Sequence, residues 1–537
     1  ILQLAISSGT DRALGQIYNG SIATLSNFNA GGSNAYAFNS KKTQDGNTYL
    51  NINAHQPLEG PVSWYEAHLC SEEGWNITGA LFACTPSILL GNNQYLGWAH
   101  TVNYPDKLDV YQLDMNPGNK IEYKFDDEWI KLEENTARLK VKVAGLTVSA
   151  KRKVYWSKYG PTLITKKGTF AIRTAAFFEV RALEQWYRMN KATNFNSFYK
   201  ALKMEALPGY NVMYADRYDT IFYMSNGKIP LRNKGYNWKG TIPGNSSKTL
   251  WEKYHPIEDL PHYTNPSSGY LFNSNHSPYN ASGKENNLNL RNFDATMGFE
   301  TWENNRSTRF MELLKPLDKI SYDNFKKIKF DGQLPAKLNY IGTNTDTLFM
   351  LNENEYPALT ELISTLNKWD RKSNTESRGA AAFAIMYYYI TDKLSKGQNE
   401  YHNLSKQKCV EIMNYAKTYM ETHFGKASIT LGEYQKLVKG NKTIPLPGLP
   451  DVIASMESEP FKNGMVKGRQ GESFIQLVKF GKDGPQIETI HSYGASKKAA
   501  SKHYNDQMEM FTAQQLKPMT LDKATIYKNA EKIYHPK

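Results

Sequence analysis

Apolar and polar positions alternate along the first third of the chain, which is the period of a half-buried β-strand. Residues 48–54 alternate in this way, while residues 33–38 form a short run of small and aromatic residues, and the two segments flank an Asp-Gly-Asn turn at 45–47. We expect them to form a hairpin that carries His55 back beside Ser33. Further strands are predicted at 62–69, 95–102 and 108–113, with several more between residues 119 and 165.

The middle of the chain changes to a helical period. Helices are predicted at 197–205, before Pro208, and at 305–314, where Asn305 is a candidate cap and Pro316 marks the end. Longer helices are predicted at 377–394 and 406–424, and strands return at 473–480 and 487–491. Strands first, helices in the middle and returning strands predict an α+β fold, with one sheet assembled from both ends of the chain.

This pattern divides the chain into four parts. Residues 1–32 are expected to be a tail, with one or two helical turns near 11–18 and a flexible Asn-Phe-Asn-Ala-Gly-Gly stretch directly before Ser33. Residues 33–300 would hold the first part of the core with a β-rich extension, 301–465 a mainly helical region, and 466–537 the returning strands. Because the chain starts at Ile1 rather than Met, we expect that a preceding segment has been removed.

Composition narrows the choice of function class. With 40% hydrophobic and 22% charged residues among 537, the chain has the balance of a globular protein rather than a disordered one. Lysine and arginine exceed aspartate and glutamate by 65 − 52 = 13, but the excess is spread along the chain. We therefore expect a solvated surface, not binding to nucleic acid or to a membrane. No apolar run reaches the ~18 residues that a spanning helix needs.

Most familiar catalytic and metal-binding patterns are missing from the sequence. We find no GxSxG elbow, Walker A loop, GxGxxG or HExxH motif, and no histidine pair at metal-ligand spacing on an evident helix. The three cysteines, Cys70, Cys84 and Cys409, form no CxxC pair, which disfavours a thiolate zinc site. Cys70 and Cys84 are close enough in sequence to form a disulfide, although nothing requires it.

The segment Gly31-Gly32-Ser33 is the remaining candidate for chemistry. A serine hydroxyl is a poor nucleophile until a base takes its proton. If the chain is cut between Gly32 and Ser33, the new α-amine becomes that base, since an α-amine has a pKa of about 8 and is partly unprotonated near neutral pH. One residue then supplies both nucleophile and base. Two glycines before the serine also suit a self-cleaving N→O acyl shift, because small residues let the backbone strain.

Five blocks of the sequence, in the right order, resemble the β subunit of the penicillin acylase family, which also contains cephalosporin, aculeacin and acyl-homoserine lactone acylases. The resemblance extends along most of the chain. It implies an α+β, four-layer αββα N-terminal-nucleophile (Ntn) hydrolase sandwich with a helical insertion in the middle, and an amidohydrolase that acts on linear amides. The blocks are Ser-Asn-Ala-Tyr-Ala-Phe at 33–38 with His55 22 residues after the serine, Tyr-Glu-Ala-His-Leu at 65–69, Gly-Trp-Ala-His-Thr-Val-Asn at 97–103, Asn-Ser-Asn-His-Ser-Pro at 273–278, and His-Tyr-Asn-Asp-Gln at 503–507 with 471–480 upstream.

The resemblance also implies roles for individual residues. Ser33 would be the nucleophile, and His55 would lie beside it and orient its amine and hydroxyl. The backbone N–H of Val102 and the side-chain amide of Asn275 would form the oxyanion hole. Arg309 resembles an arginine that the family keeps near the site. The alternatives are structural: a strand-end histidine at 55, a buried asparagine at 275 and a helix-surface ion pair at 309.

The resemblance implies no organic cofactor. Asp106 and Asp109 are similar to an Asp-x-x-Asp step that contributes to a structural calcium site in penicillin G acylases, with a solvated turn as the alternative. The implied partners are a small N-acyl substrate (an acyl-homoserine lactone, a β-lactam or a lipopeptide) and the α subunit of the same precursor, of which this chain would hold only a small part. The family is usually exported, so a periplasmic or secreted location is expected.

One residue departs from the family pattern. Gln56 stands directly after the histidine, where acylases for phenylacetyl or long fatty chains often have an apolar residue. Two rival functions remain: an unprocessed, non-catalytic relative that binds or scaffolds, and a basic polymer-binding protein. Candidate walls of the acyl pocket, each of which suits a plain core equally well, are Trp64, Leu81, Phe82, Ile88 and Leu89.

Overall fold

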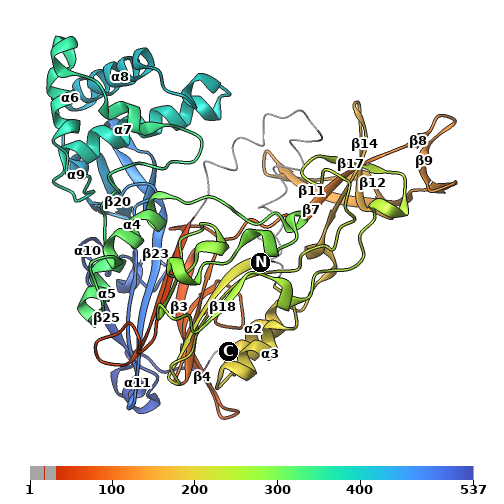
Figure 1. Cartoon of the computed structure of the whole chain (residues 1–537), viewed down its shortest axis with the longest axis horizontal. Helices are drawn as coiled ribbons and strands as arrows, with labels where there is room; N and C mark the ends of the chain where they lie inside the picture. Colours follow the sequence, from red (N-terminus) through yellow and green to blue (C-terminus); the bar gives the residue numbers. More distant parts are fainter. Residues whose placement is uncertain (1–16, 18–31, 208, 536–537) are drawn as a thin grey trace.

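The computed structural model describes residue 17 and residues 32–207 and 209–535, and two sheets form its centre (Figure 1). The first sheet has nine strands, and its main path runs in the order β19 (Tyr270–Asn273), β1 (Ser33–Phe38), β2 (Thr48–Pro57), β23 (Val466–Gly481), β20 (Gln435–Lys439) and β21 (Lys442–Pro445). β22 (Met456–Pro460), β24 (Gly484–His491) and β25 (Lys517–Met519) are attached beside this path. The second sheet has seven strands in the order β18 (His262–Thr264), β16 (Ile221–Gly227), β15 (Gly209–Asp216), β6 (Leu96–Thr101), β5 (Leu90–Asn93), β4 (Trp75–Phe82) and β3 (Trp64–Ser71).

The first sheet combines segments from both ends of the described chain. β1 and β2 pair antiparallel with Ser33 opposite Ala54, so the predicted hairpin is confirmed. β2 then pairs with β23, and β1 pairs with β19 on its other side. The expectation of one sheet built from both ends of the chain is therefore confirmed, and so is the mixed class of the fold. The predicted tail lies outside the described residues, apart from Gly32 and Ile17.

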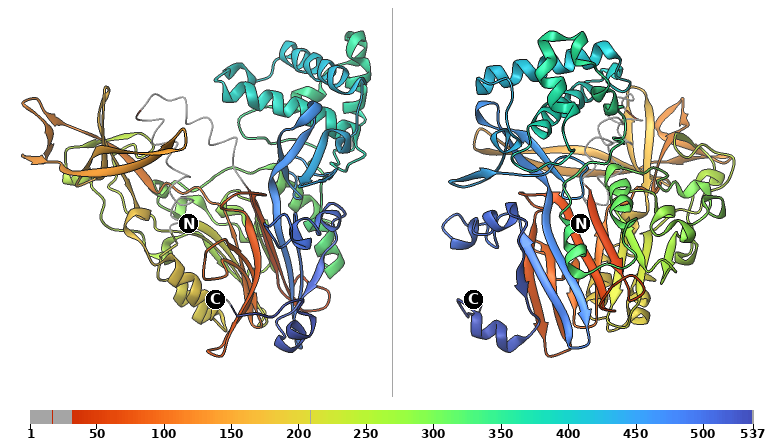
Figure 2. Two further views of the ribbon diagram at one scale, coloured as in Figure 1. Left: turned by 180° about the vertical axis from the view of Figure 1, so that it is seen from behind. Right: turned by 60° about the vertical axis from the view of Figure 1, so that its left-hand side comes forward.

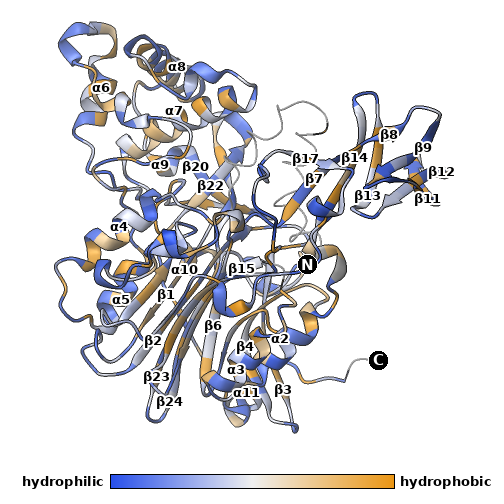
Figure 3. Cartoon of the chain, turned by 45° about the vertical axis from the view of Figure 1, so that its right-hand side comes forward, coloured by the Kyte–Doolittle hydropathy of each residue, from blue (hydrophilic) through white to orange (hydrophobic). Residues whose placement is uncertain are grey.

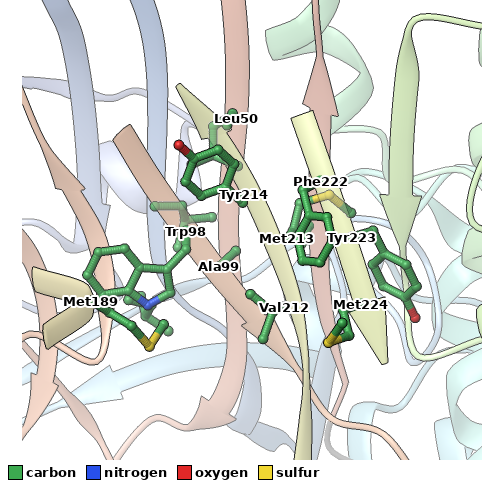
Figure 4. Close-up of a cluster of buried hydrophobic side chains, with 14 of the residues drawn as sticks. Leu50, Trp98, Ala99, Met189, Val212, Met213, Tyr214, Phe222, Tyr223 and Met224 are labelled. Carbon is green, nitrogen blue, oxygen red and sulfur yellow. The ribbon is translucent and has the colours of Figure 1, made fainter. Parts of the chain in front are cut away.

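An apolar core lies between the two sheets. Ala35 and Ala37 of β1 belong to it, while Tyr36 and Phe38, which alternate with them, belong to a second cluster on the other face of the sheet. Figure 4 shows Leu50 of β2 beside Trp98 and Tyr214 of the second sheet. Since β1 is buried along its whole length, its sequence reads as continuous small and aromatic residues rather than as a half-exposed strand.

Helices cover the outer faces of both sheets. On the first sheet, α4 (Asn305–Leu314), α5 (Tyr322–Lys329) and α10 (Met508–Thr512) contribute Phe310, Phe325 and Phe511 to the outer cluster. On the second sheet, α2 (Ala182–Asn190) and α3 (Phe195–Leu202) contribute Trp186 and Phe198 to the core. α11 (Lys523–Asn529) follows near the end of the chain. Hydrophobic stretches run along the core strands, while many outer turns are hydrophilic (Figure 3).

Two further regions project from the same end of the core (Figures 1 and 2). One is helical: α6 (Thr360–Asn367), α7 (Arg378–Ser395), α8 (Lys406–Phe424) and α9 (Leu431–Tyr434) surround an apolar cluster of their own. The other is β-rich and contains a six-stranded and a three-stranded sheet. Its strands are β7 (Leu108–Leu113), β8 (Met115–Asn116), β9 (Asn119–Phe125), β10 (Glu128–Lys131), β11 (Glu133–Val143), β12 (Leu146–Ser157), β13 (Gly160–Thr165), β14 (Gly168–Thr174) and β17 (Thr241–Gly244).

The predicted helices are present, and their first turns show what sets their boundaries. α4 covers the predicted residues 305–314, but its cap is Asn304, which exchanges hydrogen bonds with Ser307. α3 begins earlier than predicted because Asn194 caps it in the same way. In the described part of the chain, no helix is both long and apolar enough to cross a bilayer. Cys70 and Cys84 are free and exposed, so they form no disulfide.

Candidate active site

Ser33, the first residue of β1, lies at the end of the strand and is almost fully buried. Its Oγ donates to the carbonyl oxygen of Gly32 at 2.7 Å and accepts from the backbone N–H of His55 at 3.3 Å. A bulge between Ala54 and His55 shifts the pairing of β2 with β23 at this point, and such irregularities often re-aim groups beside functional sites. The hydroxyl is thus held next to the Gly32–Ser33 peptide bond.

His55 presents its backbone, rather than its ring, to Ser33. The ring Nε2 lies 3.1 Å from Oδ1 of Asn53. Burial, reinforced by the positive charges of Arg306 and Lys329, lowers the pKa of His55 well below its usual range. The imidazole is therefore neutral at neutral pH, and its position suits orientation of neighbouring groups rather than the carrying of charge.

Asn275 contacts both Ser33 and Val102. Its Oδ1 accepts from the Ser33 backbone nitrogen at 2.7 Å, and its Nδ2 donates to the Val102 carbonyl at 2.8 Å. Asn275 has a φ of 64°, in the left-handed region. For a residue other than glycine this conformation is uncommon and costs about 1–3 kcal/mol, although asparagine adopts it more readily than most residues. The two residues expected to form the oxyanion hole therefore lie together beside the serine.

A buried hydrogen-bond network behind Asn275 joins the strand ends around the site. Oδ1 of Asn273 accepts from Oγ1 of Thr101 at 2.5 Å, from Nδ2 of Asn211 at 3.1 Å and from the backbone N–H of Asn275 at 2.9 Å. The Tyr223 hydroxyl donates to Oδ1 of Asn211 at 2.8 Å. Asn273 thus links the residue before Val102 to Asn275. The sequence reasoning missed this role, although the Asn-x-Asn spacing at 273–275 was a signal for it.

The structure brings Arg306 to Ser33, where the sequence predicted Arg309. Arg306 donates from Nη1 to the Ser33 carbonyl at 2.9 Å, from Nη2 to Oδ1 of Asn275 at 3.0 Å and from Nε to Asp451 at 2.8 Å. Arg306 lies in the first turn of α4, which starts beside Asp451. Arg309, one turn later, faces Asp331 instead and binds its two carboxylate oxygens at 3.0 Å each. The prediction for Arg309 is therefore corrected, and Arg306 takes that place.

This arrangement of serine, asparagine and arginine lies in a chain whose residues 3–528 match the penicillin amidase family. The chain belongs to the penicillin amidase family. It is 24% identical over 536 residues to the acyl-homoserine lactone acylase PvdQ of Pseudomonas fluorescens (strain Pf0-1). The aligned region covers 90% of this chain and 68% of that relative. It is 22% identical over 559 residues to aculeacin-A acylase of Actinoplanes utahensis, covering 91% of this chain and 68% of the relative.

A solved structure shares the fold. Thermostable penicillin G acylase from Alcaligenes faecalis superposes with a TM-score of 0.67 at 17% sequence identity, covering 94% of this chain and 100% of that one. The mixed architecture with antiparallel sheets is therefore that of a penicillin acylase. Membership of the penicillin amidase family, with relatives named as acylases, makes the protein an amidohydrolase.

The two aspartates for which family resemblance implied calcium are held by an arginine. Nε of Arg232 lies 2.9 Å from Oδ2 of Asp109, and its Nη2 lies 3.6 Å from Oδ1 of Asp106. Trp251 donates to the same Oδ2 of Asp109 at 2.7 Å. All of these groups are buried, so the alternative of a solvated turn is wrong as well. Within the described residues no cluster of three His, Cys, Asp or Glu is arranged for a metal ion, and the positive charge of the Arg232 guanidinium already lies beside the two carboxylates. The residues present do not fit a calcium site.

The side chains considered as walls of an acyl pocket all belong to the large apolar cluster that includes the core between the sheets. Trp64 stacks on Phe82 with ring centroids 4.2 Å apart. Gln56, the departure from the family pattern, donates its backbone N–H to Oγ of Ser473 at 3.1 Å. Burial suits a plain core for the full set, and a role as walls of an acyl pocket stays a prediction: Trp64, Leu81, Phe82, Ile88 and Leu89.

Proposed function

We propose that the protein hydrolyses the linear amide bond of N-acyl compounds through an acyl-enzyme on Ser33, after it has cut its own chain at the Gly32–Ser33 bond. The observation that carries this proposal is the convergence of Asn275 and Arg306 on both sides of the Ser33 backbone. Relatives are named for acyl-homoserine lactones and aculeacin A, and the structural neighbour for penicillin G. These names define the substrate classes: acyl-homoserine lactones, lipopeptides and β-lactams with an acylated amine.

The architecture supports the same proposal. Two facing sheets carry helices on their outer sides, and we infer that these make the four-layer αββα sandwich of Ntn hydrolases. We further propose that the segment before Ser33 stays bound as the α subunit after cleavage. The periplasmic or secreted location belongs to the proposal too, since it rests on the family resemblance.

Self-cleavage would start from the hydrogen-bonded pair in the intact chain, with Oγ of Ser33 2.7 Å from the Gly32 carbonyl oxygen. Oγ attacks the Gly32 carbonyl carbon, and the hydroxyl proton passes to the Ser33 nitrogen as the C–N bond breaks. The product is an ester between Gly32 and Oγ, with a free α-amine on Ser33. Water then hydrolyses the ester, which releases the Gly32 carboxylate and restores the hydroxyl.

Hydrolysis of the substrate would reuse the same atoms. The α-amine takes the Oγ proton as Oγ attacks the acyl carbonyl carbon. The oxyanion then accepts hydrogen bonds from the Val102 N–H and from Nδ2 of Asn275, which turns to it from the Val102 carbonyl; such a donor is worth about 3 kcal/mol in the transition state. The α-ammonium protonates the leaving amine as the amide C–N bond breaks. Water, deprotonated by the amine, finally releases the carboxylic acid from Ser33.

The test compares two buried serines in the protein expressed from its complete coding sequence. Ser33→Ala should stay uncut in intact-mass measurements and hydrolyse none of a panel of N-acyl-homoserine lactones, penicillin G and an acylated lipopeptide. Ser63→Ala is the control, because Ser63 also donates to a carbonyl, that of Gly60 at 2.8 Å, and this bond is no part of the proposed site. A new amino terminus at Ser33 in wild type and in the control supports the proposal. Cleavage or amide hydrolysis by Ser33→Ala would overturn it, and an uncut wild type would favour the non-catalytic relative.

A further inference from the structure

The backbone just after Val102 is held by a buried glutamate. The Tyr104 N–H donates to Oε1 of Glu300 at 2.5 Å. The Tyr104 ring also packs against Trp302, with ring centroids 6.0 Å apart. The chain that leaves β6 is therefore fixed along the segment around Glu300, two residues beyond the N–H expected to bind the oxyanion.

The other side of Val102 is fixed as well. Its carbonyl accepts from Nδ2 of Asn275 at 2.8 Å and from Nδ2 of Asn211 at 3.3 Å. The hydroxyl of the preceding Thr101 is bound to Asn273. Beyond the Val102 carbonyl, the Asn103 side chain donates to Oγ of Ser225 at 3.2 Å and to the Asn226 carbonyl at 2.8 Å. The Tyr104 N–H bond to Glu300 is the next restraint and acts on the backbone itself.

A contribution to the stability of the fold does not explain the presence of Glu300. It is 1% exposed, and among the described residues its Oε2 has no hydrogen-bond partner. A buried carboxylate without full pairing is destabilising, and an apolar residue of similar size is commonly as good or better. Besides the backbone of Glu300 itself, the Tyr104 N–H is the donor that the described residues offer to this carboxylate, which points to a role in holding the Tyr104 segment.

We propose that Glu300 is a positioning residue for the amide hydrolysis, which keeps the Val102 N–H aimed at the oxyanion through its hydrogen bond to Tyr104. This inference rests on the proposed function. Glu300 touches neither substrate nor Ser33; it acts through the backbone of residues 102–104. A misplacement on the order of 1 Å at a catalytic group costs about 100-fold in rate, so one such restraint has a measurable effect.

The charge of Glu300 makes the restraint depend on pH. Burial raises the pKa of Glu300 to about 7, against the opposing effects of its own backbone N–H, the Tyr104 N–H and the charge of Lys107. Burial also lowers the pKa of Lys107 to about 8. Tyr104, Tyr223 and Tyr279 face the same carboxylate, and their pKa values are all raised, so they stay neutral. An ionised carboxylate accepts the N–H more strongly than a neutral one, so the restraint strengthens as pH rises through about 7.

The experiment uses Glu300→Ala, Glu300→Asp and Glu300→Gln in the complete, processed protein, with Glu303→Ala as the matched control. Glu303 lies on the same segment but accepts from the Asn280 side chain instead. For N-octanoyl-homoserine lactone, kcat of Glu300→Ala should fall by about 100-fold with KM nearly unchanged. Glu300→Gln, which still offers an oxygen to Tyr104, should restore most of kcat, and Glu300→Asp, one methylene shorter, should not. The ratio of wild-type to Glu300→Gln kcat should rise between pH 6 and pH 8.

A binding measurement separates positioning from folding. Heptylboronic acid forms a tetrahedral adduct with Oγ of Ser33, and an oxygen of this boronate takes the place of the oxyanion. Octanoic acid instead binds as the reaction product does. Glu300→Ala should lose affinity for the boronic acid by about the factor lost in kcat and keep its affinity for octanoic acid. Equal losses for both ligands, or a kcat equal to that of Glu303→Ala, would overturn the proposal.

Hydrogen exchange distinguishes failure of this inference from failure of the proposed function. Deuterium uptake of the peptide covering residues 102–107 is measured at pH 6 and pH 8. This uptake reports on the restraint by Glu300 even if the protein hydrolyses no substrate. Uptake in Glu300→Ala should exceed that of wild type, Glu300→Gln and Glu303→Ala. If wild type hydrolyses no N-acyl compound but the four proteins show this exchange pattern, the proposed amide hydrolysis is wrong and the restraint of the backbone by Glu300 is supported. If uptake is the same in all four proteins, the role of Glu300 is refuted whatever the reaction.

Discussion

Gly32 and Arg306 lie so close together that position 32 has no room for a side chain. A Cβ atom on Gly32 would be 2.7 Å from Nη2 of Arg306 and 2.9 Å from its Cζ. The guanidinium cannot retreat easily, because it is bound to the Ser33 carbonyl, Asn275 and Asp451. The small residue before the serine thus has a steric reason in addition to the flexibility inferred from the sequence.

We predict that Gly32→Ala slows self-cleavage by about tenfold or more, since the methyl group displaces either Arg306 or the scissile bond. Intact mass followed over time after cell-free synthesis measures the rate. Gly118→Ala is the matched control, because the nearest atom to a Cβ at Gly118 is 3.5 Å away. Cleavage of Gly32→Ala at the wild-type rate would contradict a tight fit at this position.

The two arginines of α4 should behave differently. Arg306→Ala removes the hydrogen bonds to the Ser33 carbonyl and to Asn275 and leaves the part-buried Asp451 without its cation, so we expect uncut precursor or a kcat lowered by about 100-fold. Arg309→Ala breaks the pair with Asp331 and should lower Tm while the processed enzyme keeps most of its kcat. Mass, kcat and Tm of both variants give the comparison. The reverse pattern would return Arg309 to the active site.

The choice between these arginines shows what a single sequence can and cannot predict. Local signals predicted the β1–β2 hairpin and the helix that carries both arginines, because alternation, turn residues and caps act over a few positions. Which arginine meets Ser33 depends on Asp451, 145 positions further along the chain from Arg306. No local pattern contains that contact.

The same limit explains the calcium prediction. Asp106 and Asp109 have the spacing of an ion-binding step, but their cation is the guanidinium of Arg232, 123 positions beyond Asp109. Val102 and Asn275 could be named as candidates from the sequence, because the blocks around them resembled a known family, and their role in an oxyanion hole stays a prediction. Glu300 was missed, since a positioning residue carries no chemical signature of its own, and the role of Asn273 was missed although the Asn-x-Asn spacing at 273–275 was a signal for it.

Asn275 offers a way to separate self-cleavage from turnover. In the intact chain its Oδ1 accepts from the Ser33 nitrogen, whereas the oxyanion needs the N–H of its Nδ2. Asn275→Asp keeps the acceptor and loses the donor, so we expect cleavage to proceed and kcat to fall by about 100-fold or more. Asn275→Ala, which loses both, should also slow cleavage. Time-resolved intact mass and kcat measure the two steps, and an unchanged kcat in Asn275→Asp would remove the side chain from the mechanism.

Arg232 is predicted to stabilise the protein in place of a metal ion. Arg232→Met leaves two buried carboxylates without a cation, which costs about 3–5 kcal/mol and should lower Tm strongly. Arg188→Met is the control, because its pair with Glu184 is exposed and worth about 1 kcal/mol or less. Neither calcium chloride nor a chelator should move the wild-type Tm. A rise of that Tm with calcium would show that the site binds the ion after all.

His100 provides a test of pH dependence with a defined sign. The ring accepts from Nε1 of Trp186 at 3.1 Å and lies 3.2 Å from the Asn211 carbonyl, an arrangement that suits a neutral imidazole. Burial lowers the pKa of His100 from 6.5 to about 4. Between these values the unfolded chain binds a proton that the folded protein does not, so this contribution to stability is complete above pH 6.5 and is lost as pH falls toward 4.

We therefore predict that the difference in thermal stability between wild type and His100→Gln grows with pH up to about 6.5 and is constant above it, with a slope of at most about 1.4 kcal/mol per pH unit. Thermal unfolding of both proteins at matched pH values measures this difference. His503 should give the opposite sign, since hydrogen bonds to Asp506 and Glu531 raise its pKa. The His503→Gln effect should be small, because that pair is largely exposed to solvent. A wild-type advantage at His100 that is equal at pH 4 and pH 7 would mean that the ring is charged in the folded protein.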